Sequence, residues 1–281
     1  MVVAPAQSMR IISWNLLHGQ VIPPTSDQDW RQSLITAAKT VADNYRPDFI
    51  GLQEVDYLQP RSAEINQTQL VAESMGLKYW AYLPTIFGTP GEKWEKVKDL
   101  QRAVITQNST PTKTMSYGIG IATNQVIKKI HVKKLGRSII GLPLLIPKDN
   151  GGVRFIYVKD EPRVALTAEL ENGLTITTTH LSFAPVVNIY QLNRLCFSLS
   201  KLPGKLVLTG DLNIIANLPS RFSSYRSLAK QMTYPSWKEK IQFDYIMVPK
   251  SSVNSITTTP LNTVKTNISD HTPIGLELRF Q

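Results

Sequence analysis

Lys205-Leu206-Val207-Leu208-Thr209-Gly210-Asp211-Leu212-Asn213 is a strand-and-turn signature from which the rest of the chain can be interpreted. Its hydrophobic residues are continuous rather than alternating, which is typical of a strand buried on both faces. The strand ends in a turn that carries Asp211 and Asn213. Ligands of open α/β sheets bind beyond the carboxyl ends of the strands, so this acid and amide can point at one substrate atom. Gly-Asp-x-Asn is also ordinary turn chemistry, and this stretch alone does not separate the two interpretations.

The composition is that of a globular protein. The chain has 281 residues, of which 42% are hydrophobic and 19% are charged. This length can bury a large core and allows either one large α/β domain or two small ones. The formal net charge of +10 favours an anionic partner, such as nucleic acid, a phosphorylated metabolite or an anionic lipid surface.

Features of the sequence also bear on where the protein works. Cys196 is the single cysteine, so no internal disulfide can form and a reducing compartment is the simplest interpretation. No apolar run approaches the ~20 residues that span a bilayer, and the first eight residues lack the pattern of a signal peptide. We therefore expect a cytoplasmic protein without a transmembrane segment.

Residues suited to metal binding or acid–base chemistry recur where predicted strands end. A first strand is predicted over residues 10–15 and ends at Asn15. A helix is predicted to begin near residue 29, and a second strand is predicted over residues 48–54, ending in the acid Glu54. Further strands are predicted over residues 163–170, 174–181, 241–248 and 273–280. The polar residues of this group are Asn15, Glu54, His180, Asp211, Asn213, Asp244, Asp270 and His271. Each has an ordinary structural explanation, but polar groups collected at one edge of a sheet are costly to bury without a shared task.

Two long segments interrupt the regular pattern, at residues 84–116 and 136–162. In the first, a spacing that includes Trp94 hints at a short amphipathic helix. Both segments are rich in basic residues, and long loops are where substrate contacts concentrate. We expect them to determine which substrate is chosen, or else to be solvated loops whose charges aid solubility. Their basic residues include Lys93, Lys96, Lys98, Arg102, Arg137 and Lys148.

In its motifs the chain resembles the endonuclease/exonuclease/phosphatase family of metal-dependent phosphoesterases related to deoxyribonuclease I. The resemblance covers nearly the whole chain and rests on motifs in the family's order. These are Ser-Trp-Asn15, Leu-Gln-Glu54-Val-Asp, Tyr117-Gly118-Ile119-Gly120, Thr-Thr-His180-Leu, Thr-Gly-Asp211-Leu-Asn213, Phe-Asp244-Tyr and Ser-Asp270-His271. The implied fold is a four-layer α/β sandwich, in which two mainly antiparallel sheets pack face to face with helices outside. The implied organisation is a disordered extension over residues 1–8 and one catalytic domain over residues 9–281.

The resemblance also implies a metal site. Glu54 would be the principal ligand of Mg²⁺ or Mn²⁺, with Asn15 and Asp270 beside it or acting through water. Hard oxygen ligands without a thiol suit Mg²⁺ rather than Zn²⁺.

Catalytic roles follow from the same resemblance. Asp211 would orient and deprotonate the attacking water, with Asn213 fixing its position. His271 would donate a hydrogen bond to the phosphoryl oxygens while Asp244 holds its ring. His180 would be a second imidazole in contact with the phosphate.

Four further residues are candidates for substrate binding. His18 follows Asn15 closely and can either touch substrate or cap a loop. Arg61 follows Glu54 in a pattern similar to bacterial members of the family, with a helix cap at Ser62 as the alternative. Arg163 is either a phosphate clamp or the start of a strand, and Trp94 offers an apolar contact at the rim.

The sequence thus predicts a hydrolase that cleaves a phosphodiester or phosphomonoester by metal-assisted in-line attack of water. A nuclease that uses its basic surface to hold DNA or RNA is the alternative. A non-catalytic binding module is disfavoured because every catalytic residue of the pattern is present. The expected partner is an anionic phosphoester, with nucleic acid as an alternative, and the expected oligomeric state is a monomer.

Overall fold

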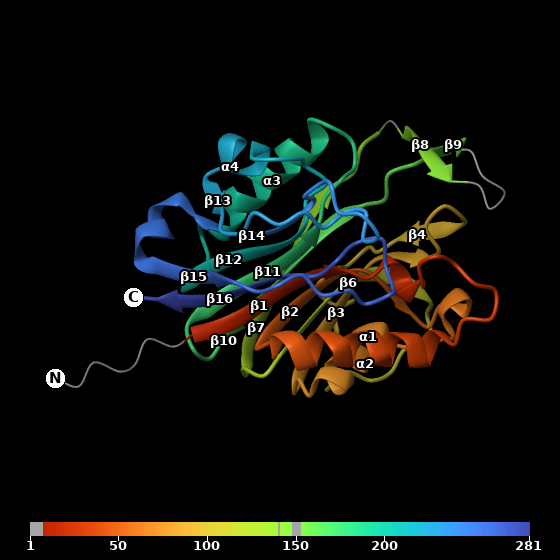
Figure 1. Cartoon of the computed structure of the whole chain (residues 1–281), viewed down its shortest axis with the longest axis horizontal. Helices are drawn as coiled ribbons and strands as arrows, with labels where there is room; N and C mark the ends of the chain where they lie inside the picture. Colours follow the sequence, from red (N-terminus) through yellow and green to blue (C-terminus); the bar gives the residue numbers. More distant parts are fainter. Residues whose placement is uncertain (1–7, 140, 148–152) are drawn as a thin grey trace.

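Two β-sheets pack face to face in the computed structural model, which describes residues 8–139, 141–147 and 153–281 (Figure 1). In the first sheet the strands follow the order β15-β16-β1-β2-β6-β3-β4, and β5 pairs with β3. The bounds are β1 (Ser8–Asn15), β2 (Phe49–Tyr57), β3 (Tyr79–Gly88), β4 (Trp94–Lys96), β5 (Ile105–Thr106), β6 (Ser116–Thr123), β15 (Ile256–Pro260) and β16 (Ile274–Phe280).

The second sheet has the order β13-β14-β12-β11-β10-β7, and a separate two-stranded sheet joins β8 to β9. The bounds are β7 (Ile127–Gly136), β8 (Leu142–Pro147), β9 (Val153–Val158), β10 (Arg163–Leu170), β11 (Leu174–His180), β12 (Lys205–Asp211), β13 (Tyr225–Ser227) and β14 (Asp244–Pro249).

Helices cover the outer face of each sheet, which gives the expected four layers (Figure 1). The helices α1 (Trp30–Tyr45) and α2 (Gln67–Met75) pack on the first sheet, and α3 (Val187–Leu199) and α4 (Leu218–Phe222) cover the second. Short 3₁₀ turns are η1 (Leu17–Gly19), η2 (Pro60–Ser62) and η3 (Lys250–Ser255). The predicted α/β sandwich of two mainly antiparallel sheets is confirmed.

Three apolar clusters hold these layers together. One lies between the sheets and joins residues such as Ile11 and Ile121 of the first to Leu166 and Ile246 of the second. The other two lie between each sheet and its helices, where Cys196 is buried beneath α3. The continuous hydrophobic runs noted in the sequence arise because the central strands are covered on both faces.

The sheets are antiparallel except where a helix joins two neighbouring strands. The chain passes from β1 through α1 to β2, and from β11 through α3 to β12, and both pairs are parallel. A parallel pair needs such a crossover connection, and its carboxyl ends meet at the same edge. Asn15 consequently lies opposite Gln53, and His180 lies opposite Asp211.

The structure corrects several boundaries. Ser8 already belongs to β1, whereas the expectation for residues 1–7 falls outside the described residues. The helix expected near Trp94 is wrong, because this segment pairs with β3 as the strand β4. Much of the segment 136–162 was expected to be irregular, but it contains the paired strands β8 and β9.

Within the described residues, no helix combines the length and the apolar character needed to cross a membrane.

Candidate active site

The carboxyl ends of the two parallel strand pairs meet at one end of the sandwich. Asn15 ends β1, Glu54 lies near the end of β2, and His180 and Asp211 end β11 and β12. Because each sheet contributes one pair, packing of the sheets brings four polar side chains from distant parts of the chain together. The site therefore exists only when both sheets are docked.

Asn15 lies at the centre of this group. Its Nδ2 donates to Glu54 Oε1 at 2.9 Å and to Asp211 Oδ2 at 3.0 Å, and its Oδ1 accepts from the backbone N–H of Leu17 at 3.0 Å. The side chain is fully buried. Asn15 thus holds the two carboxylates in place while its oxygen accepts from Leu17.

Backbone irregularities aim Glu54 and Asn213 into the site. The pairing of β2 with β6 has a register shift between Leu52 and Val55, and Glu54 within it has φ of 54°. A bulge of this kind redirects a side chain from its regular position on the strand. Asn213 has φ of 51° and donates its backbone N–H to Asp211 Oδ1 at 2.9 Å.

Two imidazoles flank Asp211. His180 Nε2 lies 3.1 Å from Asn213 Nδ2 and 3.6 Å from Asp211 Oδ2, and His271 Nε2 lies 3.8 Å from the same oxygen. His271 is held from behind, because its Nδ1 lies 2.7 Å from Asp244 Oδ2. Thr233 also donates to this oxygen at 2.5 Å. The arrangement leaves Nε2 of His271 facing Asp211.

The two imidazoles differ in charge. Burial lowers the pKa of His271, but the charges of Asp244 and Asp211 outweigh this effect and raise it to about 10. Burial, together with the positive charges of Arg163 and His271, lowers the pKa of His180 well below its usual value. His271 is therefore an imidazolium at neutral pH and His180 is a neutral ring.

The carboxylates of the site resist ionisation. Burial and the charge of Asp270 raise the pKa of Glu54, and burial also raises the pKa of Asp270. Burial raises the pKa of Asp211 to about 7, against the opposing effect of His271. Acids crowded in this way are stabilised in their charged form by a cation.

Two sets of side chains in this region could hold a metal ion. Asp211, Asp244 and His271 offer ligand atoms within 4.8 Å of one another. In that set, Asp244 Oδ2 accepts hydrogen bonds from His271 and Thr233, while its Oδ1 is buried without a hydrogen-bond partner among the described residues. Glu54 and Asp270 form the second set, because the charge of Asp270 raises the pKa of Glu54 and both offer the oxygen ligands that a hard cation prefers.

Arg61 and His18 lie beside the site but have partners of their own. Arg61 forms a double hydrogen bond to the buried carboxylate of Asp56, through Nε at 2.9 Å and Nη2 at 2.8 Å. Ser62 donates to the same carboxylate at 2.9 Å, so it does not act as the helix cap that was the alternative. His18 stacks on Trp30 with ring centroids 6.0 Å apart, and burial together with the charge of Arg61 lowers its pKa to about 3.

Arg163 begins β10 and is buried in an ion pair. Its guanidinium lies 2.8 Å from Asp160 Oδ1 and 3.1 Å from Glu161 Oε2. Arg163 therefore contributes positive charge near His180 while its hydrogen bonds are taken by acids. Trp94 is not part of the group around Asp211; it lies on β4, where the Arg137 guanidinium is 5.7 Å from its ring centroid.

The sequence reasoning missed several residues that support the site. Gln53 is fully buried and donates to Thr178 Oγ1 at 2.8 Å, so it links β2 to β11 across the sandwich. Ser269 Oγ donates to the backbone carbonyl of Asn15 at 2.7 Å and accepts from the backbone N–H of His271 at 3.0 Å. The sequence signal that could have identified Gln53 and Ser269 was an amide or hydroxyl side chain directly beside a predicted site residue.

Comparison with solved structures identifies similar folds. An endonuclease/exonuclease/phosphatase family protein from Bacteroides thetaiotaomicron is 16% identical with a TM-score of 0.62, and the match covers 99% of this chain and 97% of that chain. A mannosyl-6-phosphatase from the same organism is 15% identical with a TM-score of 0.56, covering 97% and 100%. ANGEL2, a 2′,3′-cyclic phosphatase solved with adenosine-2′,3′-vanadate, is 14% identical with a TM-score of 0.60, covering 98% and 96%.

Sequence comparisons gave one match at the level of the family. No curated protein matches the chain. The model of the endonuclease/exonuclease/phosphatase family matches residues 12–271, which include every residue of the site from Asn15 to His271. The chain belongs to the endonuclease/exonuclease/phosphatase family.

Proposed function

We propose that this protein is a divalent-metal-dependent phosphoesterase whose single catalytic domain spans residues 9–281. The observation that carries the proposal is the convergence of Asn15, Glu54, His180 and Asp211 where the parallel strands of both sheets end. Buried acids, amides and imidazoles collected at one such edge are suited to binding an anionic group and to moving a proton beside it.

Proton transfer is assigned to Asp211. Its Oδ1 accepts from the backbone of Asn213 and its Oδ2 accepts from Asn15, so the carboxylate is fixed in orientation. A pKa of about 7 matches that of an efficient base near neutral pH. Asp211 in its ionised form would take the proton of a water that attacks phosphorus, and Asn213 would help to hold that water.

The imidazoles are assigned to the phosphoryl oxygens. His271, kept protonated by Asp244, would donate from Nε2 to an oxygen on which negative charge develops. His180 is neutral and receives a hydrogen bond from Asn213 or donates from the opposite nitrogen, so it would contact the phosphate without adding charge.

Glu54 and Asp270 are assigned to Mg²⁺ or Mn²⁺, because both offer carboxylate oxygens and the charge of Asp270 raises the pKa of Glu54. A bound ion would supply positive charge for the phosphoryl oxygens. Arg61 and Arg163 would add to the positive potential from their ion pairs, and His18 lies near enough to contact substrate.

Two of the similar structures are a mannosyl-6-phosphatase and a 2′,3′-cyclic phosphatase. They support phosphoester hydrolysis as the class of reaction. Identity near 15% carries the fold and does not transfer either substrate to this chain.

A panel of phosphoesters tests the proposal. Purified protein is assayed with Mg²⁺ or Mn²⁺ on bis(p-nitrophenyl) phosphate, p-nitrophenyl phosphate, sugar phosphates, 2′,3′-cyclic nucleotides, plasmid DNA and RNA. We expect turnover of at least one compound by wild type and its loss in Asp211→Asn. Absence of turnover on the whole panel with either metal, in folded protein, would contradict the proposal.

A nuclease is the second candidate function, and the net charge of +10 favours it. Contact with many phosphates of a polynucleotide releases counterions, so its affinity falls steeply as salt rises, whereas a small phosphoester gives a shallow slope. Binding to an oligonucleotide is therefore measured from low to moderate salt with Asp211→Asn, which prevents cleavage. A flat profile would rule the nuclease out.

A further inference from the structure

A small pocket lies beside the site, between the open edges of the two sheets. Its volume is about 190 Å³. The first sheet contributes residues of β3, β4 and the following turn, and the second contributes residues of β7 and the start of β10. The last strands of the two sheet orders, β4 and β7, form its two sides. Figure 1 shows β4 at the end of the sandwich toward which β1 runs.

The pocket has a mainly apolar lining to which three cationic residues also contribute. Val97, Leu100, Pro162 and Val164 form apolar parts of the lining. Three cations, Lys96, Lys134 and Arg137, also line it, and no carboxylate does.

Within the described residues, none of these three cations forms an ion pair. Glu95 neighbours Lys96 on β4, but successive side chains of a strand point to opposite faces. The Arg137 guanidinium is further placed by the ring of Trp94. The three cations of the pocket thus have no directly ion-paired acid among the described residues.

The strand register fixes the distance from this pocket to the catalytic centre. Lys134 of β7 is opposite Val164 of β10. Ala165 of β10 is opposite Thr179 of β11, so the next pair along is Val164 and His180. Lys134, Val164 and His180 therefore form a row across three adjacent strands on one face. Two strand spacings separate the backbones of Lys134 and His180 by roughly 10 Å.

We propose that this pocket binds a second phosphate group of the substrate, at a distance from the phosphoester that is cleaved. This inference rests on the proposed function of the neighbouring site. A separation of roughly 10 Å is too large for one phosphate to occupy both places, but a single substrate can bridge it. The substrate class is therefore a phosphoester with a further phosphate, either a small bisphosphorylated compound or a nucleic-acid strand.

A matched pair of substrates tests the subsite. A nucleoside p-nitrophenyl phosphodiester is compared with the same diester carrying a second phosphate on its sugar, with Mg²⁺ or Mn²⁺ present. The measured quantity is the ratio of kcat/KM between the two substrates. In wild type we expect the second phosphate to raise kcat/KM about tenfold, the worth of one charge-assisted hydrogen bond.

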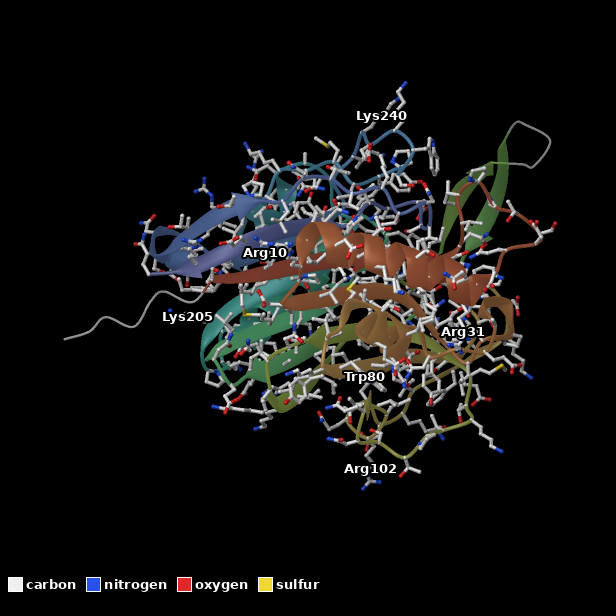
Figure 2. All side chains as sticks on the ribbon, turned by 60° about the horizontal axis from the view of Figure 1, so that its bottom comes forward. Arg10, Arg31, Trp80, Arg102, Lys205 and Lys240 are labelled. Atoms are coloured by element: carbon white, nitrogen blue, oxygen red, sulfur yellow. The ribbon has the colours of Figure 1, made fainter. Side chains whose placement is uncertain are left out.

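Two triple variants identify the residues responsible. The pocket variant combines Lys96→Ala, Lys134→Ala and Arg137→Ala. The matched control removes the same number of charges nearby with Lys98→Ala, Arg102→Ala and Lys133→Ala, none of which lines the pocket. Arg102 projects outward from its loop (Figure 2), where its side chain is 91% exposed. We expect the substrate ratio to approach one in the pocket variant and to stay near the wild-type value in the control.

Three results would overturn the proposal. They are the absence of any gain in wild type from either the second sugar phosphate or an oligonucleotide extension, an equal fall of the gain in both triple variants, and an equal loss on both substrates in the pocket variant. A bisphosphorylated nucleoside that gives the full gain identifies a small substrate, whereas a gain that appears only with oligonucleotides identifies a strand.

A binding experiment separates this proposal from the proposed function. Binding of inorganic pyrophosphate is measured by calorimetry without metal on wild type and on both triple variants. Weaker binding in the pocket variant alone supports the subsite even if none of the diesters is hydrolysed. Equal binding by all three proteins contradicts the subsite even if hydrolysis is fast.

Discussion

The catalytic centre and the pocket beside it are built in opposite ways. In the centre, Asn15 and Asp211 are buried, they end regular strands, and each is fixed by several hydrogen bonds. In the pocket, Lys134 and Arg137 are exposed, and their charges have no acidic partner among the described residues. A preorganised centre suits a reaction whose charges develop at fixed positions, and long exposed cations suit attraction of a variable second group.

Removal of the divalent metal should produce the largest difference in behaviour between the catalytic centre and the pocket. Excess EDTA should abolish hydrolysis, because Glu54 and Asp270 need a cation to be charged side by side, and added Mg²⁺ or Mn²⁺ should restore it. Pyrophosphate binding by the pocket should persist under chelation. Full turnover in EDTA would show that the centre works without a metal.

Substitution in the centre should have the next largest effect. Asp211→Asn and His271→Ala should each lower turnover on the order of 10²–10⁴, the worth of a positioned acid–base group. Melting temperature should change little in Asp211→Asn, because the buried carboxylate it removes is costly to ionise. The exposed Asp99→Asn is the control. If either variant keeps the wild-type kcat on the true substrate, the role assigned to the substituted residue is wrong.

The free energy of unfolding should also respond differently to substitutions between the packed sheets and at the open edge that lines the pocket. Gly51 of β2 faces the second sheet, and a Cβ there would lie 2.6 Å from Thr209 Oγ1 and 2.7 Å from Thr178 Oγ1. Gly51→Ala should therefore lower the free energy of unfolding by about 1–3 kcal/mol through overpacking. Urea unfolding measures this change, with Lys134→Ala at the open edge as the control. Equal stability of wild type and Gly51→Ala would mean that the sheets can move apart at no cost.

The smallest effect is expected at Trp94. Loss of its ring removes the contact that places Arg137, worth about 0.5–1 kcal/mol at an exposed site. Trp94→Ala should lower kcat/KM on the substrate with a second phosphate about two- to fivefold. Trp237→Ala, at an exposed indole outside the pocket, is the control. An equal loss on the simple diester would assign Trp94 to the support of the centre.

The contrast also explains how far the sequence could be interpreted. Asn15, Glu54, His180 and Asp211 could be placed together because each ends a strand whose apolar run is visible in the sequence. The relation between His271 and Asp244 came from resemblance to the family, since nothing local joins residues 27 positions apart. These positions agree with the structure, whereas their chemical roles stay predictions.

The pocket could not be predicted because its charge comes from separate strands. Lys96 and Lys134 become neighbours only through the pairing of β4 with β3 and of β7 with β10. The spacing that includes Trp94 and Val97 suggested a helix, but pairing with Gly88 and Ile86 of β3 overrides this local preference. The hydrogen bond between Gln53 and Thr178 could not be predicted from the sequence either, because it joins residues of two different sheets.

The position of β16 has a consequence for synthesis of the protein. This strand lies between β15 and β1, and it pairs antiparallel with β1 from Ser8 opposite Arg279 to Ser13 opposite Ile274. The whole second sheet is made between β6 and the return of the chain to the first sheet. A nascent chain that ends before residue 270 therefore lacks both His271 and the strand that covers the edge of β1. Hydrolytic activity should appear only after the chain through β16 has left the ribosome.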